Sequence, residues 1–456
     1  MKHLKLKNPF NIPLPVDTHR APEVRHATAP PTIAVSPSHF RYVKPRLLVK
    51  MLDRIKAGTP LFYDKRDPSV RLLSPVSGIV QNITFGHRRC IDEIVIEPSP
   101  NGSGPYYEPL SMDQITRLSR EDTIELLKTR GIWPFIHQFP YKDIPKTELN
   151  AKLAIICLQS TDPFAPLPRV MIRQTGTRDY LTAALAIMSI LANEVIVAAP
   201  VSEMPYVNHI RELITHSIHD RYPASDPKVI LYQVRKHPGQ NTALSMDIQD
   251  FLDMGACLLT GSMPTTRLYR ICSDVTAPGI HVLAQKGSPA SFLLSSVCSD
   301  VSKLEQKNIV ASGLFSGRLA QIHSHMRHFE SSLVCIDREY PEEPFGFVAP
   351  GFEKASESNT FLSRVTSRIY NLDSTVHGEH RPCINCGYCQ KKCPVELFPQ
   401  FIMKACLAGE EEEAIELGML DCTLCGLCSF VCPSKIELSD IIEQAMNQYY
   451  KERVTI

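Results

Sequence analysis

Two cysteine runs near the C-terminal end decide how the last part of this chain folds. The first reads Cys383-Ile-Asn-Cys386-Gly-Tyr-Cys389-Gln-Lys-Lys-Cys393-Pro394, and the second reads Cys422-Thr-Leu-Cys425-Gly-Leu-Cys428-Ser-Phe-Val-Cys432-Pro433. Both have the spacing C-x2-C-x2-C-x3-C-P, which is the spacing of bacterial ferredoxins with two [4Fe-4S] clusters. Thiolates separated by two residues can wrap a loop around three corners of a cubane, and the proline turns the chain away after the fourth ligand. The runs therefore predict two clusters and an electron-transfer role.

The fourth cysteine of each run is expected to ligate the cluster of the other run, as is usual in such paired sites. We assign one cluster to Cys383, Cys386, Cys389 and Cys432, and the other to Cys422, Cys425, Cys428 and Cys393. Gly387 and Gly426 are expected to let the backbone approach inorganic sulfide, where a Cβ atom would collide. Structural zinc is the alternative, because four-cysteine zinc sites also use C-x2-C pairs. Two identically spaced runs that both end in proline favour iron–sulfur clusters over zinc.

The segment between the two runs predicts helices rather than strands. Residues 397–408 and 410–417 have helical character, and the acidic run 410–413 marks a helix start, where carboxylates meet the positive end of the helix dipole. Residues 346–456 are therefore predicted to form an all-helical dicluster ferredoxin domain. Cys406 lies in this connector without ligand spacing and is expected to be a core residue.

The composition is that of a globular protein with several domains. The chain has 456 residues, of which 43% are hydrophobic and 21% charged, with 49 basic and 48 acidic residues. This balance argues against a nucleic-acid partner. The N-terminal residues lack the apolar run of a signal peptide, and Asn193 and Glu194 interrupt the most apolar stretch, 180–200, before it reaches spanning length. We expect no direct membrane span, so that any membrane association is made through a partner.

Six further cysteines are scattered singly along the chain. Because nothing indicates secretion, disulfides are not expected, and buried roles as small hydrophobic residues fit them better. The six are Cys90, Cys157, Cys257, Cys272, Cys298 and Cys335.

Residues 1–100 are predicted to contain an N-terminal segment and a small β-domain. Within 45–97, the strand patterns around 58–65, 74–80 and 91–96 resemble the barrel-sandwich hybrid domains of lipoyl and biotinyl carriers. Lys65 lies further from the following strand than the cofactor lysine of such carriers, and its neighbours are charged. A structural use of the Asp64-Lys65 tip is therefore favoured.

Residues 101–253 alternate strand and helix, which predicts a Rossmann-like α/β domain. Expected strands are 151–158, 195–199 and 228–234, with a helix over 181–192 and an amphipathic stretch over 206–219. The glycine-rich G-x-G-x-x-G loop of a dinucleotide site is absent from this sequence. No flavin is therefore predicted in this chain.

Residues 254–345 return to strands, expected at 279–284, 290–294 and 308–312, and suit a β-grasp domain with a helix over its sheet. The loop 312–317, Ser-Gly-Leu-Phe-Ser-Gly, is predicted to lead into a helix at Arg318. It could form a backbone nest for an anion, but an ordinary turn is the favoured interpretation.

Two histidine groups are candidate metal sites. His323, His325 and His328 do not share one helical face, and His216 and His219 have no clear third ligand. Neither group predicts a metal site, and no catalytic nucleophile with a neighbouring base stands out.

Several stretches in this order resemble the NqrA subunit of the sodium-translocating NADH:quinone reductase (Nqr) and its relative, the RnfC subunit of the Rnf complex. The resemblance rests on these stretches: residues 4–15, Leu61-Phe-Tyr-Asp-Lys-Arg-Asp-Pro68, Ser74-Pro-Val-Ser-Gly-Ile-Val80, Pro344-Phe-Gly-Phe-Val-Ala-Pro-Gly351, Asn359-Thr-Phe-Leu-Ser363 and Cys428-Ser-Phe-Val-Cys-Pro-Ser-Lys435. It implies a barrel-sandwich hybrid (lipoyl-like) domain, a Rossmann-like domain, a β-grasp soluble-ligand-binding domain and a helical C-terminal domain. NqrA proteins lack most of the cluster cysteines, whereas this chain has all eight, as RnfC does.

The resemblance implies a peripheral subunit on the cytoplasmic face of the bacterial inner membrane. Expected partners are the membrane-embedded and flavin-bearing subunits of an Nqr- or Rnf-type complex and a soluble electron donor, with NADH and quinone handled by the complex. Sodium movement is not expected in this chain. Two alternatives remain open: an NADH- or ferredoxin-facing subunit like RnfC, and a non-redox scaffold whose clusters only hold the C-terminal fold together.

Overall fold

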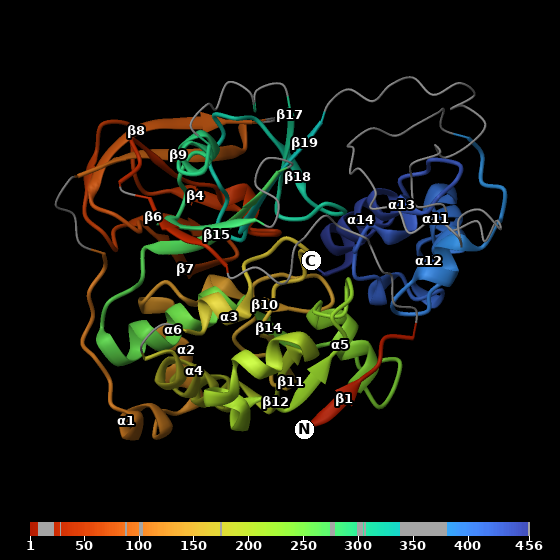
Figure 1. Cartoon of the computed structure of the whole chain (residues 1–456), viewed down its shortest axis with the longest axis horizontal. Coiled ribbons are helices and arrows are strands. Elements are labelled where there is room, and N and C mark those ends of the chain that lie inside the picture. Colours follow the sequence, from red (N-terminus) through yellow and green to blue (C-terminus); the bar gives the residue numbers. More distant parts are fainter. Residues whose placement is uncertain are drawn as a thin grey trace.

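The fold is taken from a computed structural model (Figure 1). It describes residues 1–7, 22–27, 29–86, 89–99, 104–173, 176–273, 279–298, 304, 307–337 and 381–454. Three parts of the sequence that carry the family resemblance lie outside the described residues: 8–15, 344–351 and 359–363.

The first domain is a sandwich of two small sheets, which confirms the predicted β-domain. One sheet has the strand order β3-β9-β8-β5 and the other the order β4-β6-β7. The bounds are β3 (Ile33–Val35), β4 (Pro45–Leu47), β5 (Arg54–Ile55), β6 (Pro60–Asp64), β7 (Asp67–Leu73), β8 (Gly78–Phe85) and β9 (Ile91–Pro98). Alternate residues of both sheets, among them Leu61, Val80 and Ile94, face inward and form a fully buried core.

The hairpin tip between β6 and β7 joins this domain to its neighbours. Lys65 is exposed, whereas the Arg66 guanidinium donates to Asp64 at 2.8 Å and to both carboxylate oxygens of Asp143 at 2.7 and 3.0 Å. The same guanidinium donates to the Tyr450 hydroxyl at 3.0 Å. Arg66 thus links the hairpin tip to the segments that contain Asp143 and Tyr450. The tip therefore has a structural use, as the sequence predicts.

Replacing Arg66 should therefore be costly. In Arg66→Met the buried carboxylates of Asp64 and Asp143 lose their counter-charge, and we expect a loss of stability of about 3 kcal/mol. Urea unfolding followed by circular dichroism measures this as a lower midpoint. Lys65→Met is the matched control and should leave the midpoint unchanged; equal effects of the two substitutions would contradict a structural role centred on Arg66.

The second domain is a six-stranded sheet with helices on both faces. The strand order is β1-β13-β12-β11-β14-β10, parallel except for the β10–β14 pair. Its strands are β1 (Lys2–Leu4), β10 (Ile136–Gln138), β11 (Ala151–Cys157), β12 (Ala192–Pro200), β13 (His216–Ile218) and β14 (Leu244–Met246). Its helices are α1 (Met112–Thr116), α2 (Arg120–Thr129), α3 (Pro168–Met171), α4 (Thr177–Leu191), α5 (Pro227–Val234) and α6 (Ile248–Thr260). The N-terminal strand β1 completes this sheet, and α6 crosses the boundary predicted between residues 253 and 254.

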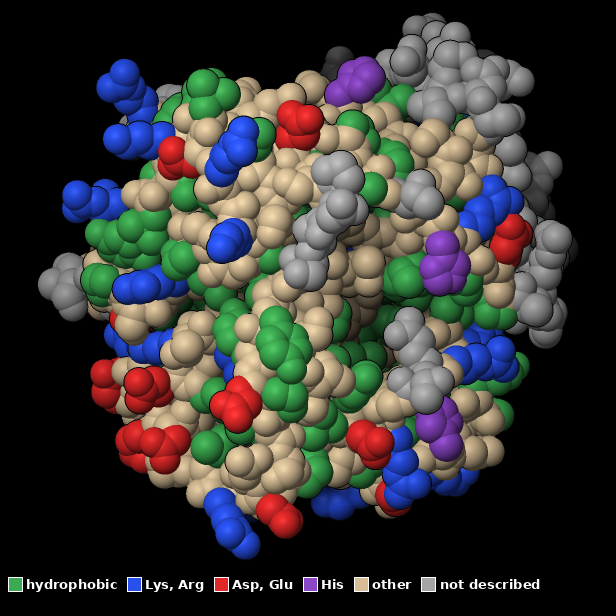
Figure 2. Space-filling model, turned by 90° about the vertical axis from the view of Figure 1, so that its left-hand side faces the viewer, with side chains coloured by type: hydrophobic (Ala, Val, Ile, Leu, Met, Phe, Trp, Pro, Cys, Tyr) green, Lys and Arg blue, Asp and Glu red, His purple; other side chains and the backbone are tan. Residues whose placement is uncertain are grey.

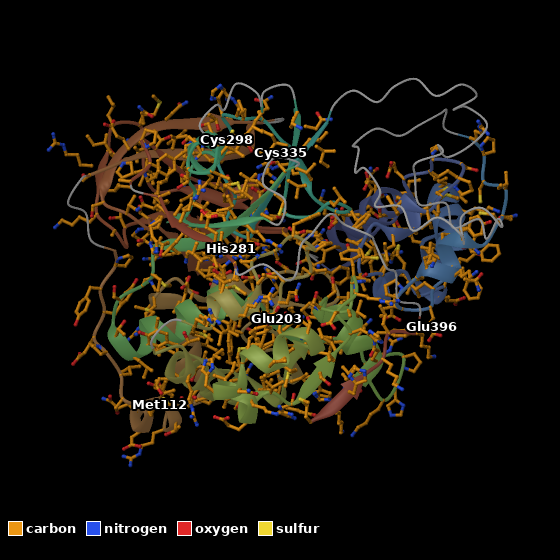
Figure 3. All side chains as sticks on the ribbon, in the orientation of Figure 1. Met112, Glu203, His281, Cys298, Cys335 and Glu396 are labelled. Atoms are coloured by element: carbon orange, nitrogen blue, oxygen red, sulfur yellow. The ribbon has the colours of Figure 1, made fainter. Side chains whose placement is uncertain are left out.

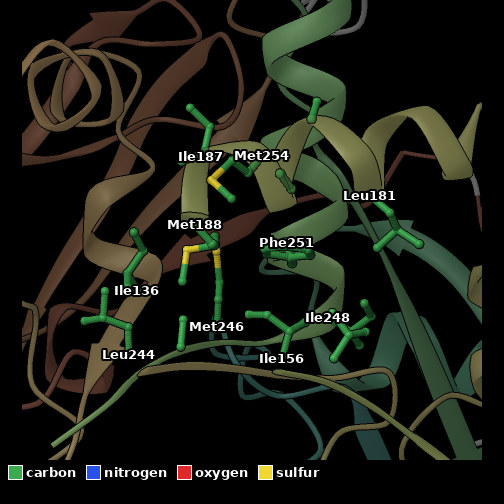
Figure 4. Close-up of a cluster of buried hydrophobic side chains, with 14 of the residues drawn as sticks. Ile136, Ile156, Leu181, Ile187, Met188, Leu244, Met246, Ile248, Phe251 and Met254 are labelled. Carbon is green, nitrogen blue, oxygen red and sulfur yellow. The ribbon is translucent and has the colours of Figure 1, made fainter. Parts of the chain in front are cut away.

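Helices α4 and α6 cover one face of the sheet, and α5 covers the other. Figure 4 shows the first contact, where Ile187 and Met188 of α4 meet Phe251 and Met254 of α6 above Ile156 of β11. On the opposite face, Ile230 and Leu231 of α5 pack on strand residues such as Ile155. Helices on both faces of a mostly parallel sheet define a doubly wound α/β domain.

Two expectations for this domain are wrong. Residues 228–234 form helix α5, not a strand, because Asp226 caps its start by accepting from the Lys228 N–H at 2.7 Å and Pro227 occupies the first turn. The stretch 206–219 is not one amphipathic element: two 3₁₀ helices, Val201–Tyr206 and Asn208–Leu213, precede strand β13.

The third domain is a mixed sheet with the order β18-β17-β19-β15-β16-β2, on which helix α7 packs. The bounds are β2 (Val24–His26), β15 (Thr266–Cys272), β16 (Ile280–Gln285), β17 (Lys307–Ala311), β18 (Arg318–Ala320), β19 (Ser332–Asp337) and α7 (Ala290–Ser295). Residues 290–294, expected as a strand, form α7, whose Leu293 and Leu294 are buried on Tyr269 and Val282. Arg318, expected to begin a helix, begins strand β18 instead, because it pairs with Ala311 of β17.

Residues 381–454 contain helices and no strand, as predicted. The helices are α10 (Tyr388–Lys392), α11 (Pro399–Ala408), α12 (Glu411–Glu416), α13 (Leu427–Phe430) and α14 (Leu438–Tyr449), followed by a π-helical turn, Tyr450–Val454. In Figure 1 this C-terminal domain lies to one side of the other three. Across the described part of the chain, no helix is long and apolar enough to span a membrane.

The scattered cysteines largely follow expectation. Cys157, Cys257, Cys272 and Cys335 are buried, and Cys298 is half-buried. Cys298 and Cys335 lie in the third domain, away from the C-terminal helices (Figure 3). The expectation of burial is wrong for Cys90, which is exposed in the connection between β8 and β9.

Candidate iron–sulfur cluster site

The two cysteine runs have the same local backbone. Each has a left-handed residue between its first and second cysteines, Asn385 with φ 53° and Leu424 with φ 58°. Each has a left-handed glycine directly after its second cysteine, Gly387 with φ 74° and Gly426 with φ 75°. A third left-handed residue follows each Cys-Pro pair, at Glu396 and Lys435. Because non-glycine residues rarely adopt positive φ, the repetition shows that both loops are bent in one specific way.

Each glycine starts a short helix that carries the third cysteine of its run. Cys389 lies in α10 after Gly387, and Cys428 lies in α13 after Gly426. The two short helices pack against each other, which brings the two runs together. This placement explains how ligands from both runs can reach a shared centre.

The thiols fall into two neighbourhoods, and each contains cysteines of both runs. Burial raises the pKa of Cys389 to about 11, and Cys386 and Cys432 add to the rise. Burial likewise raises the pKa of Cys432, with contributions from Cys386 and Cys383. The fourth cysteine of the second run therefore lies among the first three of the first run.

In the second neighbourhood, the fourth cysteine of the first run lies among cysteines of the second run. Burial raises the pKa of Cys393 to about 12, and Cys422 and Cys425 add to it. Burial also raises the pKa of Cys428 well above its usual value, with contributions from Cys422, Cys425, Cys393 and Cys389, so that Cys428 lies between the two neighbourhoods. Crossed ligation stays a prediction, which the position of Cys393 among thiols of the second run favours. With their raised pKa values, Cys393 and Cys428 are protonated at neutral pH, and binding a metal centre would release their protons.

The two neighbourhoods differ in their access to solvent. Cys425, Cys428, Cys389 and Cys393 are buried, whereas Cys386 is exposed and Cys383 is half-buried. The group around Cys383 therefore faces outward, and the group around Cys425 faces the rest of the protein.

Sulfur contacts support a ligand role for the run cysteines and a core role for Cys406. The Leu397 N–H donates to Cys393 Sγ at 3.4 Å, a contact of the kind that tunes iron–sulfur centres. Cys389 Sγ lies 3.1 Å from Gln400 Oε1. Cys406 Sγ instead lies 3.8 Å from Met419 Sδ within an apolar cluster, which is the core position expected for it.

Among the described residues, no three His, Cys, Asp or Glu side chains are grouped closely enough to hold one metal ion. His328 is used structurally, since it stacks on Phe135 with ring centroids 4.0 Å apart and bonds Asp250 at 2.9 Å.

The inward-facing loop is held by two residues of the α/β domain. Lys228 of α5 is buried, and its ammonium donates to the carbonyl of Cys422 at 2.7 Å and to that of Pro140 at 3.1 Å. The Tyr222 hydroxyl donates to the carbonyl of Cys425 at 2.5 Å. Burial lowers the pKa of Lys228 to about 8, so that it is mostly protonated at neutral pH. The carboxylates of Asp226 and Asp421 favour this buried ammonium, and a thiolate-bound cluster at Cys422 would add to their negative charge.

The loop 312–317 of the third domain packs on the same segment. A Cβ atom at Gly426 would lie 2.2 Å from the carbonyl oxygen of Phe315, and the Phe315 ring meets Phe430 edge-on with centroids 5.0 Å apart. The sequence predicts a turn here, with an anion nest as the alternative. The structure shows a turn between strands that contacts the cluster-binding loop.

This contact predicts unequal effects at two equivalent glycines. Gly426→Ala should displace the loop from Phe315 and lower the melting temperature by several degrees, because the carbonyl cannot accommodate a Cβ atom. Gly387→Ala, compared in the chain without clusters, has nearly the same φ and no protein atom within 4 Å of the added Cβ, and it should lose only the left-handed backbone preference, about 1 kcal/mol. Differential scanning calorimetry of the two variants compares them, and an equal or larger effect at Gly387 would contradict the prediction.

A cavity of about 530 Å³ lies at the carboxyl ends of β11 and β14, where ligands of open α/β sheets bind. All four domains line it, including Gln159 and Asp247 from the sheet, Arg318 from the third domain and Glu443 from α14. Tyr222 lines it as well and connects it to the Cys425 loop. Burial lowers the pKa of His137, at its wall, to about 4, so this histidine is neutral at pH 7.

Sequence reasoning predicted the eight cysteines as ligands but missed the residues that contact their loops. Lys228, Tyr222 and Phe315 are far away in the sequence, and no motif marks them. The left-handed positions could have been found, because Asn385 and Leu424 occupy equivalent places in two aligned runs.

The comparisons with known proteins agree with this division of the chain. Residues 4–99 match the NqrA N-terminal barrel-sandwich hybrid domain, 118–263 the NqrA second alpha/beta domain, and 382–436 a 4Fe-4S dicluster domain. The NqrA subunit of the Na(+)-translocating NADH-quinone reductase of Hahella chejuensis is 23% identical over 98% of this chain and 100% of that protein. The NqrA subunit of Vibrio vulnificus is 25% identical over 92% and 94%.

A third relative, the NqrA subunit of Neisseria meningitidis, is 23% identical over 98% of this chain and 100% of its own. An NAD+-reducing [NiFe]-hydrogenase structure is similar only at a TM-score of 0.33, with 13% identity over 50% of this chain and 49% of that chain. The chain is thus a relative of the NqrA subunits of the Na(+)-translocating NADH-quinone reductases that also contains a 4Fe-4S dicluster domain.

Proposed function

We propose that this chain is a peripheral electron-transfer subunit of a membrane-bound, sodium-translocating NADH:quinone oxidoreductase, and that it relays electrons through two [4Fe-4S] clusters. The observation that carries the proposal is that the fourth thiol of each run lies among thiols of the other run: Cys432 lies near Cys386 and Cys383, and Cys393 lies near Cys422 and Cys425. Crossed ligation of this kind holds two clusters close together. The names of the relatives supply the complex, the sodium and the quinone.

Cys383, Cys386, Cys389 and Cys432 would hold the outward-facing cluster, and Cys422, Cys425, Cys428 and Cys393 the inward-facing one. The clusters, when bound, supply one-electron oxidation and reduction. The chain's own residues bury the inward group, fix its loop through Lys228 and Tyr222, and leave Cys386 at the surface. An electron can therefore enter at the surface and continue toward the other domains, or follow the same path outward.

The proposal also includes the fold types of the second and third domains and the place of the chain in the complex. The second domain is Rossmann-like, and the third is a β-grasp soluble-ligand-binding domain. The chain attaches to the cytoplasmic face of the bacterial inner membrane through the membrane-embedded and flavin-bearing subunits. The doubly wound sheet and the mixed sheet with its single helix support these assignments.

Anaerobic EPR with iron analysis of the purified chain tests the relay. We expect about eight irons per chain and cubane signals on reduction with dithionite. Zinc in place of iron would overturn the proposal. Clusters that form but accept no electron from dithionite or from the complex's own donor would instead support a scaffold, in which the metal only stabilises the C-terminal fold.

The cavity at the carboxyl ends of β11 and β14 favours a second candidate function, an NADH- or ferredoxin-facing subunit like that of the Rnf complex. Its position, at the carboxyl ends of the strands, is where α/β domains bind nucleotides. FMN released by acid from the purified chain and measured by fluorescence distinguishes the two. Stoichiometric FMN favours the Rnf-type function, and reduction of the clusters by NADH alone would point the same way.

A further inference from the structure

The outward-facing cluster site is surrounded by exposed apolar side chains. Ile384, between the first two cysteines, is 68% exposed, and α11 with its preceding residue exposes Phe398 by 42%, Phe401 by 45% and Leu407 by 68%. Single exposed apolar residues are ordinary, but a group of them marks an interaction surface.

Contacts between these residues show that they form one surface. Lys404 of α11 donates to Asn385 Oδ1 at 2.9 Å, which ties the helix to the loop that carries Ile384. The Lys404 ammonium also lies 5.8 Å from the centre of the Phe401 ring, and the Phe401 and Phe398 rings are 6.0 Å apart. We call this area, Ile384, Asn385, Phe398, Phe401 and Lys404, the cluster face.

The segment 381–409, which carries the cluster face, is basic, although the whole chain has a formal charge of only +1 and four glutamates, 410–413, follow this segment. Arg381, Lys391, Lys392 and Lys404 lie within 381–409, where Glu396 is the only acid. Lys7 pairs with that carboxylate at 2.8 Å. The face of the molecule shown in Figure 2 carries both blue and red side chains.

We propose that the cluster face docks an acidic, soluble one-electron carrier protein with its own iron–sulfur centre. This inference rests on the proposed electron relay and names its outer partner. Exposed Cys386 brings the cluster site to the surface, the apolar side chains supply a small contact area, and the lysines attract the carrier's acids. Small interfaces with complementary charge are typical of transient electron-transfer complexes, which must form and separate quickly.

A lipid surface fits this face less well. Glu410, Glu412 and Glu413 are exposed and directly follow α11, so a flat anionic membrane that reached Leu407 would also meet these carboxylates. A protein can place its acids opposite the lysines alone. Binding to anionic vesicles is therefore a competing outcome of the test.

Stopped-flow reduction of the full-length chain by a reduced, acidic two-cluster ferredoxin tests the proposal. In the variant Lys391→Glu/Lys404→Glu we expect the second-order rate at low salt to fall at least ~10-fold and its salt dependence to disappear. Phe401→Ser should lower the rate at every salt concentration, because it removes contact area and no charge. Lys56→Glu, an exposed lysine of the first domain, is the matched control and should keep the parental rate.

Iron content and reduction by dithionite separate this proposal from the relay on which it rests. If dithionite reduces every variant but the double variant reacts with ferredoxin as fast as Lys56→Glu does, the docking surface is wrong and the relay stands. If dithionite reduces none of them, the relay itself is wrong. If the double variant loses only binding to phosphatidylglycerol vesicles, the face contacts membrane and the carrier proposal is overturned.

Discussion

A variant in which Cys383, Cys386 and Cys389 are replaced by serine is expected to keep about four irons per chain and one reducible cubane. The remaining cluster should be the inward-facing one, because its ligands Cys422, Cys425 and Cys428 are untouched. Its fourth ligand decides between two arrangements. With crossed ligation it is Cys393 of the damaged run, and with separate ligation it is Cys432 of the intact run.

A fourth substitution in the same background therefore gives a clear result. Adding Cys393→Ser should abolish the remaining cluster, whereas adding Cys432→Ser should leave it in place. The structural reason is that Cys393 lies among Cys422 and Cys425, while Cys432 lies among Cys383 and Cys386. Iron analysis and EPR of the two quadruple variants measure the outcome.

Cys406→Ser is the control for loss of a thiol from the same domain, since Cys406 packs on Met419 in the core. It should retain about eight irons. If Cys432→Ser removes the last cluster and Cys393→Ser does not, the ligation is separate and the assignment made from the spacing is wrong.

Lys228→Met is expected to make the reduction potential of the inward-facing cluster more negative, on the order of 100 mV. A positive charge stabilises the reduced, more negative cluster, and at a separation of ~7 Å with an effective dielectric constant of ~20 this is worth roughly 2 kcal/mol. Lys228 donates to the carbonyl of a ligand, Cys422, at 2.7 Å, and no residue of the described chain plays the equivalent role at Cys383. The outward-facing cluster should therefore keep its potential.

An EPR-monitored redox titration resolves the two clusters in one sample, so that the outward-facing cluster serves as the internal control. Lys228→Gln separates charge from hydrogen bonding, because the amide can still donate to the Cys422 carbonyl. It should shift the potential nearly as far as Lys228→Met does. Equal shifts of both clusters would indicate a general disturbance of the domain, and no shift would mean that the ammonium lies too far from the cluster to act on it.

The same lysine illustrates why parts of the fold escape prediction. Residues 228–234 are a short apolar run, and such runs have no periodicity that distinguishes a strand from a buried helix. The capping pair Asp226 and Pro227 decides for the helix. The prediction for residues 290–294 is wrong for the same reason, and the third-domain sheet supplies the surface that buries α7.

The sequence by itself determined the local backbone of the two cysteine runs. Cysteine spacing is local, and eight cysteines, two glycines and two prolines at equivalent positions accompany the same bend in both runs. The helical connector also followed from local pattern, as α11 and α12 show. Likewise, the alternating strands of the first domain were visible because one face of each strand is buried.

Only the tertiary structure decided which thiols face solvent, what surrounds them and how the domains join. Cys386 and Cys425 occupy equivalent positions in identical motifs, yet one is exposed and the other buried. The difference arises because Tyr222, Lys228 and Phe315, from two other domains, cover the second loop. Such contacts join residues that are more than a hundred positions apart in the sequence. They therefore depend on the whole fold and not on a local pattern.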